Sequence, residues 1–461
     1  MVVLARVLSP RDYGLLAAAS GILGLFTALG CQGFLNHALQ HQTADGPDWE
    51  QHWMAGLRIQ GGLFLLANAI AGCMWMSAAH RDLAPLLHLA SLALPLSLPH
   101  LLAARMLEYR LEFRRLQMFS VGTLLLVNAV SIGLAGWIGA FGVVLGGTLM
   151  NLVPLTLCLL VSMKWRPRAG WIQAVVWRDY AATLKFGLHT NLGSLLQGAR
   201  GMAEGAVLPA TVGLADLGLI NRGQAVFQTT VGRLGTMFIE GVYPVLPRLA
   251  ADVQNFPTHL RTVLELGQLG VIGGGTFALL EGVRLSRVLY GERWAEADGL
   301  LMPGTLVGMC GVVLAMVRVL FLTTERLKES ARLSWMTAGA SILPIALTFP
   351  RPNAEEYLWL QGGTLGAATM YGLLQLRPLL DVPLWRIHVP ALVSTVVGVG
   401  VWCFVQEGVQ HLSPIARLAA GGGAYGVSVA IALRVLFPVR VSALLEIIPR
   451  GGFLLRWLRL T

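Results

Sequence analysis

Charged side chains are scarce in this chain. Asp, Glu, Lys and Arg together make up 13% of its 461 residues, whereas ordinary soluble domains carry about 25%. Hydrophobic residues make up 55%, and the mean hydropathy is +0.65. This composition excludes an ordinary soluble domain and indicates a polytopic membrane protein, with room for a dozen or more spans of about 20 residues each.

Lysine is nearly missing as well. It occurs only at Lys164, Lys185 and Lys328, so the formal net charge of +10 comes almost wholly from Arg. The sequence has no long basic hydrophilic segment that would hold a nucleic acid. Cytoplasmic loops held against anionic lipid, and an anionic cargo, explain the excess of Arg better.

The sequence motifs of several enzyme classes are missing too. There is no DxD, HExxH, Walker P-loop or GxSxG pattern, so a DxD-type sugar transferase, a metalloprotease and an ATPase all lack support. The cysteines fall in apolar runs without CxxC spacing, at Cys31, Cys73, Cys158, Cys310 and Cys403. We interpret them as small apolar residues. We therefore expect a protein that is not an enzyme and holds no metal or cofactor.

Apolar runs of about 20 residues follow one another along the whole chain, and each predicts a transmembrane helix. They lie at 13–39, 54–79, 83–106, 116–140, 141–163, 184–208, 217–246, 260–280, 297–322, 333–349, 357–376, 389–405 and 415–437. The opening stub at 1–8 is too short to span. The predicted fold is therefore all-α, with about thirteen spans.

Arg and Lys are divided unevenly between alternate loops. The set that begins with the loop at 41–52 holds roughly three times as many as the other set. Because positive residues concentrate in cytoplasmic loops, we expect this set and the C-terminus in the cytoplasm.

The chain divides into four segments by hydropathy. Residues 1–163 are predicted to form an N-terminal helical bundle and 184–380 a second bundle. Between them, 164–183 is rich in Trp and Arg, which indicates a connector helix in the membrane interface; an ordinary loop is the alternative. Residues 381–461 are predicted to add two further helices and a cytoplasmic tail. Bundles packed around a midplane site are the common plan of secondary transporters.

Charged residues interrupt the apolar run at 217–246. On a helix of about 100° per residue, positions eleven or eighteen apart return to nearly the same angle, so Arg222, Arg233 and Glu240 are predicted to share one face. An ionised side chain that faces lipid costs about 2.5–3.5 kcal/mol at mid-membrane. We therefore expect this face to line an aqueous interior. Snorkelling is the alternative for Arg222 and Glu240, which lie near the helix ends.

The preceding run at 184–208 carries charge as well. His189 and Arg200 are eleven residues apart and are predicted to share a face, and Glu204 lies one turn beyond Arg200. We interpret this face as a further part of a polar path through the membrane. An Arg200–Glu204 pair that serves packing alone is the alternative.

Three short elements occur in order along the first two thirds of the chain. The first is LARVLSPRDYGLL from Leu4, the second joins Glu204 and Leu217-Gly218 to VYPVLPR, and the third is LYGERWAEA from Leu289. Together they resemble the polysaccharide flippases of the multidrug/oligosaccharidyl-lipid/polysaccharide exporter superfamily. The sequence departs from the family in three ways: the complete first helix is reduced here to the stub, Glu204 stands where the family has Asp, and the Tyr expected after Leu217-Gly218 is missing from that position.

The resemblance implies about fourteen helices in two pseudo-symmetric six-helix bundles plus two C-terminal helices. It implies flipping of an undecaprenyl-diphosphate-linked oligosaccharide across the bacterial inner membrane by alternating access, for polysaccharide, lipopolysaccharide O-antigen or exopolysaccharide biosynthesis. The expected partners are this lipid-linked oligosaccharide, membrane lipids, and a polysaccharide polymerase and glycosyltransferases.

A diphosphate cargo gives the buried cations a role. The forked, permanently charged guanidinium group suits phosphate, so the candidate substrate-binding residues are Arg200, Arg222, Arg233 and Arg318. Arg318 lies near the cytoplasmic end of its span, where snorkelling is the alternative. Glu204 and Glu240 are candidates for taking a coupling proton or for balancing the charge of an Arg.

Three other functions compete with this one. A multidrug or cation exporter of the same superfamily would need an acidic, aromatic cavity, and the Arg content argues against it. A membrane-embedded glycosyltransferase or polymerase would need a large outward loop, and the predicted outward loops are short. A scaffold that kept the fold without transporting is the third.

Overall fold

The computed structural model describes residues 2–31, 34–35, 47–78, 80–150, 175, 177–242, 246, 254–348 and 353–438. Over these ranges the elements are helices and no strand occurs, which confirms the all-α fold class. The chain forms two compact units, Met1–Gly218 and Leu219–Thr348 with Asn353–Thr461. The division falls inside one helix.

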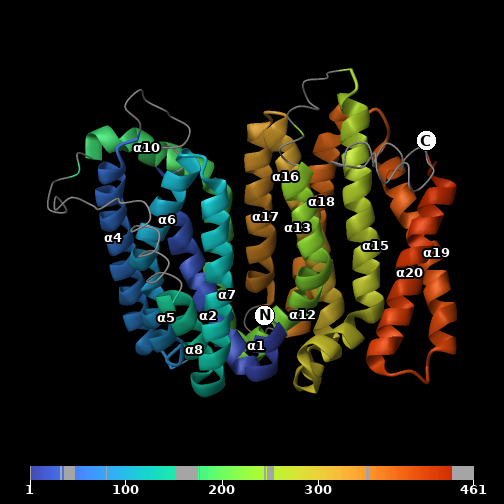
Figure 1. The fold of residues 1–461 in the computed structure, drawn as a ribbon, viewed down its shortest axis with the longest axis horizontal. Coiled ribbons are helices and arrows are strands. Elements are labelled where there is room, and N and C mark those ends of the chain that lie inside the picture. Colours follow the sequence, from blue (N-terminus) through green and yellow to red (C-terminus); the bar gives the residue numbers. More distant parts are fainter. Residues whose placement is uncertain are drawn as a thin grey trace. The chain divides into compact units, whose positions relative to one another are not determined.

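The first unit is built from helices of unequal length (Figure 1). They are α1 (Val2–Val7), α2 (Pro10–Leu29), α4 (Trp49–Trp75), α5 (Leu83–Ser91), α6 (Ala93–Tyr109), α7 (Phe113–Ile138), α8 (Ala140–Leu145), the π-helical η1 (Gly146–Met150), α10 (Trp177–Thr190) and α11 (Leu192–Thr211). The helix α12 (Leu214–Phe227) begins in this unit and continues into the second.

The second unit contains the longest described helix and the C-terminal pair. After α12 come the π-helical η2 (Gln228–Gly232), α13 (Arg233–Val242), α15 (Phe256–Tyr290), η3 (Glu292–Leu300), α16 (Leu301–Thr323), α17 (Leu327–Thr348), α18 (Ala354–Leu376), η4 (Arg377–Leu379), α19 (Leu384–Gly408) and α20 (Pro414–Leu436).

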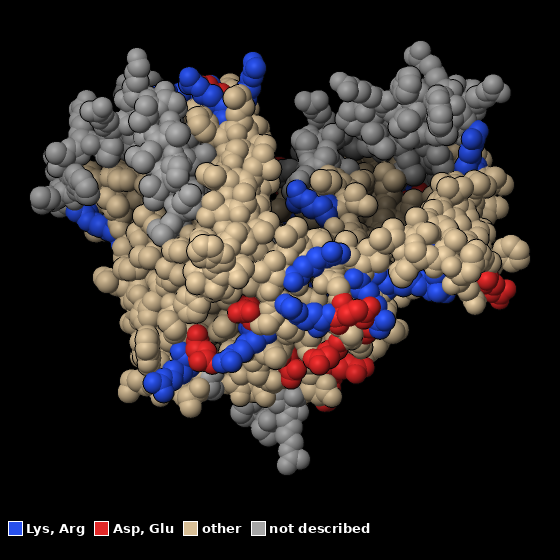
Figure 2. Space-filling model, turned by 60° about the horizontal axis from the view of Figure 1, so that its bottom comes forward, with Lys and Arg blue, Asp and Glu red and all other residues tan. Residues whose placement is uncertain are grey.

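Eight of the described helical segments are long and apolar enough to cross a membrane. Large apolar side chains stand exposed on them, including Trp137 at 89% and Phe404 at 79%. Figure 2 shows broad surfaces without charged side chains. Such surfaces suit contact with lipid and fit a polytopic membrane protein.

The start of α2 explains the first sequence element. Ser9 accepts a hydrogen bond from the backbone N–H of Asp12, and the Asp12 carboxylate accepts one from the backbone N–H of Ser9 at 3.1 Å, which makes a capping box with Pro10 in the first turn. Asp12 also accepts from the backbone N–H of Ala140 at 3.4 Å, at the start of α8. One carboxylate therefore caps two helices.

Glycines bring α2 and α11 into backbone contact. A β-carbon on Gly21 would lie 2.3 Å from the carbonyl oxygen of Gly201, and one on Gly205 would lie 2.5 Å from that of Ala18. Small residues at such positions let membrane helices approach closely. The hydropathy pattern predicts the run at 184–208 as the opening of the second bundle, whereas the structure places α11 in the first unit, against α2.

Candidate functional site

Arg200 and Glu204 form an ion pair on α11. The Nε atom of Arg200 lies 2.8 Å from Oε1 of Glu204, and both side chains are half-buried in the first unit. The i,i+4 spacing that the sequence predicts is therefore realised as a direct charge-assisted hydrogen bond.

His189 belongs to a different helix from Arg200. The pattern predicts one helix over 184–208, but α10 ends at Thr190 and α11 begins at Leu192, so the eleven-residue spacing does not place the two residues on one helical face. Asn191 stands at the break, and Asn competes with helical bonds through its own side chain. Its Nδ2 atom lies 3.5 Å from the carbonyl oxygen of Ala28, so the break contacts α2.

Arg222 is buried in the second unit, with 4% of its surface exposed. Its guanidinium carbon lies 5.1 Å from the ring centroid of Tyr290 and 5.6 Å from that of Trp294, and both rings are fully buried. Cation–π attraction to desolvated rings is worth about 2 kcal/mol or more. The third sequence element, LYGERW, thus supplies two aromatic walls around this cation.

Amide and phenol groups occupy the same unit beside α12. Gln224 donates to Oε1 of Gln361 at 3.0 Å, and Gln361 donates to the hydroxyl of Tyr357 at 2.9 Å. Gln361 and Tyr357 are buried. Sequence reasoning missed them, although a Gln inside the apolar run at 357–376 was the available signal, because polar residues inside membrane helices mark buried contacts or functional sites.

Arg233 is exposed at the start of α13. The prediction that it shares a face with Arg222 assumed an unbroken α-helix, and the π-helical η2 lies between the two residues. A π-turn closes from residue i to i+5 and takes about one residue more than an α-turn, so angles counted at about 100° per residue do not carry across it. π-turns often occur at functional sites.

Arg318 and Glu240 are the two remaining candidate residues. Arg318 is half-buried on α16. Glu240 lies on α13, and its side chain is outside the described residues.

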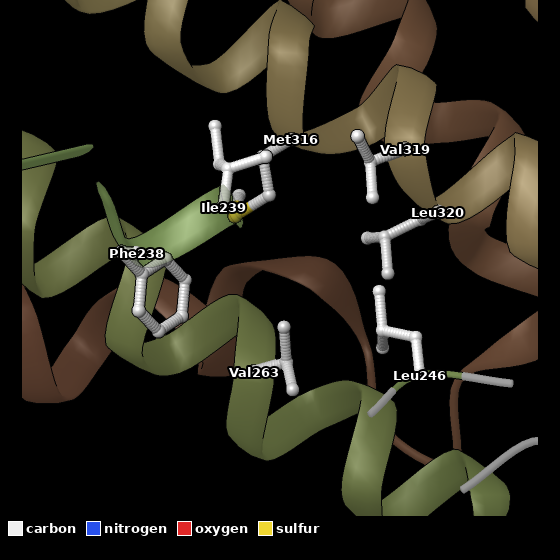
Figure 3. Close-up of a pocket in the computed structure, with 7 residues that line it drawn as sticks. All are labelled: Phe238, Ile239, Leu246, Val263, Met316, Val319 and Leu320. Carbon is white, nitrogen blue, oxygen red and sulfur yellow. The ribbon is translucent and has the colours of Figure 1, made fainter. Parts of the chain in front are cut away.

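A small cavity lies where α13, α15 and α16 meet (Figure 3). Its volume is about 10 Å³, and apolar side chains line it: Phe238, Ile239, Leu246, Val263, Met316, Val319 and Leu320. That volume is at the lower limit for one water molecule, and an apolar lining offers water no partners. This cavity is a packing void and not a place for a polar cargo.

Sequence reasoning also missed the buried acid Glu281 on α15. Glu281 is fully buried, and Arg284 donates to both of its carboxylate oxygens, at 3.0 and 2.9 Å. In the sequence, Glu281 stands just past the predicted span at 260–280 and looks like an ordinary interface residue. Among the described residues, no group of three or more His, Cys, Asp or Glu side chains is arranged to hold a metal ion.

Comparison with known proteins gives the family and the fold. The model of the family described as "Polysaccharide biosynthesis protein" matches residues 3–298. The chain is 23% identical over 321 residues to the lipopolysaccharide biosynthesis protein WzxC of Escherichia coli (strain K12); the match covers 67% of this chain and 62% of WzxC.

A solved structure has the same fold. The lipid II flippase MurJ, in an inward closed conformation, matches with a TM-score of 0.72 and 14% identity, over 94% of this chain and 95% of MurJ. The three sequence elements that resemble polysaccharide flippases lie within the region that the family model matches. The resemblance is confirmed, and the chain belongs to the polysaccharide biosynthesis protein family.

Proposed function

We propose that this protein moves an undecaprenyl-diphosphate-linked oligosaccharide from the inner to the outer leaflet of the bacterial inner membrane. The membership of the polysaccharide biosynthesis family and the likeness to a lipid II flippase support a lipid-linked sugar as cargo. The two compact units are the bodies that would alternate access to it. The C-terminus lies in the cytoplasm in this proposal, as the positive-inside pattern predicts.

The observation that carries the proposal is the presence of guanidinium groups on apolar helices. Arg200, Arg222 and Arg318 are half-buried or buried there. An ionised side chain that faces lipid costs about 2.5–3.5 kcal/mol at mid-membrane, so guanidinium groups kept on such helices indicate a functional role. A diphosphate supplies two neighbouring phosphates, and forked Arg donors bind phosphate with directional hydrogen bonds.

The four candidate cations receive different roles. Arg222 lies close to the rings of Tyr290 and Trp294, so we assign it as a fixed positive charge that attracts the diphosphate. Arg233 is exposed, so we assign it a direct contact with the cargo. Arg200 in the first unit and Arg318 in the second, both half-buried, are further candidate contacts for the cargo.

The two acids also receive different roles. The Glu204 carboxylate accepts from Arg200, which favours charge balance over proton transfer. Glu240 remains the candidate acceptor of a coupling proton.

The test uses the full chain in proteoliposomes with a fluorescent undecaprenyl-diphosphate oligosaccharide. A membrane-impermeant quencher reports how quickly the lipid exchanges between leaflets. Because hydrogen bonds to charged groups contribute about 1.5–3 kcal/mol, we expect Arg233→Ala to slow exchange by about ten-fold or more. Arg332→Ala, which removes an exposed Arg in the first half of α17, is the matched control and should exchange at the normal rate.

Two outcomes would contradict the proposal. A normal exchange rate in the Arg233→Ala protein would contradict the proposed contact between Arg233 and the diphosphate. Efflux of organic cations by a protein that leaves every diphosphate lipid in its original leaflet would support the multidrug exporter instead.

A further inference from the structure

The helix α10 lies across one end of the first unit, over α4 and α6 (Figure 1). It has 14 residues, a length of about 21 Å at 1.5 Å per residue, which is too short to cross a bilayer. A helix in this position runs along a membrane surface when the helices beneath it span the membrane.

One face of α10 is fastened to the unit. Tyr180, Thr183 and Gly187 are buried along it, at the three- and four-residue spacing of one helical face. Tyr180 packs in an apolar cluster with residues of α4 and α6, such as Ala55 and Met106.

A buried hydrogen bond fixes this face further. The Tyr180 hydroxyl lies 2.5 Å from Nδ1 of His52, in the first turn of α4. Burial raises the pKa of the Tyr180 phenol above its ordinary value, so the hydroxyl stays protonated and able to donate. The orientation of α10 about its own axis is therefore set by the first unit.

The opposite face is exposed and mixes two kinds of side chain. Trp177 is 44% exposed and Leu188 is 51% exposed, and Arg178, Ala181 and Lys185 are exposed between them. The helix carries two basic residues against one acid, Asp179. Water alone around this face would leave a Trp and a Leu unfavourably solvated. Basic residues beside Trp and Leu are typical of a helix that lies in the membrane interface.

We propose that this face of α10 binds the headgroups of anionic phospholipids, with Arg178 and Lys185 on the phosphates and Trp177 and Leu188 among the upper acyl carbons. The opposite signs of charge favour this occupant over a neutral lipid. The site is independent of the cargo, because it depends on the bilayer alone. Because Tyr180 of α10 contacts His52 of α4, lipid bound to α10 would anchor the first unit to the bilayer surface.

The first experiment measures immersion. The full chain, with its native cysteines replaced and Ala181→Cys carrying a nitroxide, is reconstituted into vesicles of phosphatidylcholine with or without phosphatidylglycerol. We expect the nitroxide to collide more often with oxygen than with a polar nickel complex, as it does near the headgroup boundary, and most clearly with phosphatidylglycerol present. The vesicles hold no second protein, so immersion reports lipid alone. A nitroxide as open to the nickel complex as one on a soluble loop, in both vesicles, overturns the proposal.

The second experiment measures lipid preference. The ratio of phosphatidylglycerol to phosphatidylcholine retained by the purified protein is compared between the wild type and the Arg178→Gln/Lys185→Gln protein. Because each cation near an anionic surface favours it by about five-fold, we expect the preference of this site to fall by about five-fold or more. Lys328→Gln/Arg332→Gln removes two exposed cations from α17 and is the matched control for this site. An equal fall in both double variants means a general charge effect and overturns the assignment to α10.

Discussion

The indole N–H of Trp402 donates a hydrogen bond to the buried carboxylate of Glu281, with 2.6 Å between Nε1 and Oε1. Gln406 donates to the same oxygen at 2.8 Å, and its own amide oxygen accepts from Arg284 at 2.9 Å. Glu281 lies on α15, whereas the indole and amide donors belong to α19, so one carboxylate joins these helices. Its charge is compensated by Arg284 and by oriented N–H donors.

Removing this carboxylate should weaken the second unit. We expect Glu281→Ala to lower the free energy of unfolding by about 3–5 kcal/mol, because it leaves the Arg284 charge and the two donors on α19 without their acceptor. The measurement is thermal unfolding of the purified protein in detergent. Glu292→Ala removes a carboxylate that is 76% exposed and should have little effect. Equal losses in the two variants would contradict the assigned role.

The aromatic contacts of Arg222 give a second prediction. Arg222→Lys keeps the positive charge but loses the planar group that lies over Tyr290 and Trp294. We expect a loss of about 1–2 kcal/mol in the free energy of unfolding, again followed by thermal unfolding. Arg332→Lys is the control, since that side chain is exposed. If Arg222→Lys unfolds like the wild type, the rings do not stabilise the guanidinium group.

Glycine substitutions test the contact between α2 and α11. Gly21→Ala places a methyl group 2.3 Å from the Gly201 carbonyl oxygen, and overpacking of this kind costs about 1–3 kcal/mol. At Gly62, inside α4, a β-carbon would have no neighbouring atom within 4 Å. Gly62→Ala should therefore stabilise the protein by about 0.5–1 kcal/mol through helix propensity. Opposite shifts in the unfolding temperature are expected, and shifts of the same sign would argue against the close contact.

The double cap at Asp12 gives a fourth prediction. Asp12→Ala removes the acceptor for Ser9 and for the first turn of α8, and loss of a cap costs about 0.5–2 kcal/mol. The amides of both helix starts should exchange with deuterium faster in this variant than in the wild type. Asp216→Ala changes an exposed acid in the first turn of α12 and leaves the α8 contact in place, so it should not alter exchange at α8. Unchanged exchange at α8 in the Asp12→Ala protein would show that this cap is unimportant.

Hydropathy predicts where the apolar helices lie, because spanning segments need about 20 apolar residues whatever their partners. The runs at 297–322 and 415–437 correspond closely to α16 and α20. The Arg200–Glu204 pair was also predictable, because it depends only on the i,i+4 spacing within one helix. The prediction of an interfacial helix at 164–183 lies mostly outside the described residues, but its last tryptophan, Trp177, begins α10.

Features that depend on contacts between distant residues were not predictable in this way. Neither the break at Asn191 nor the π-turns of η2 alter the hydropathy of the sequence, yet they decide which side chains share a face. Trp294 is recognisable as part of a motif, but its position beside Arg222 requires the fold of α12 against η3. Glu281 carries no sequence signal beyond its charge, because its partners on α19 are more than 120 residues away.

The glycine contact between α2 and α11 has a consequence for biosynthesis. The surface of α2 that accepts Gly201 and Gly205 is made early, but its partner is encoded only at Leu192–Thr211. A ribosome must therefore pass the whole connector before the first unit can close. Until then, the glycine face of α2 lacks its α11 partner, and we expect a nascent chain arrested near residue 163 to leave this face uncovered.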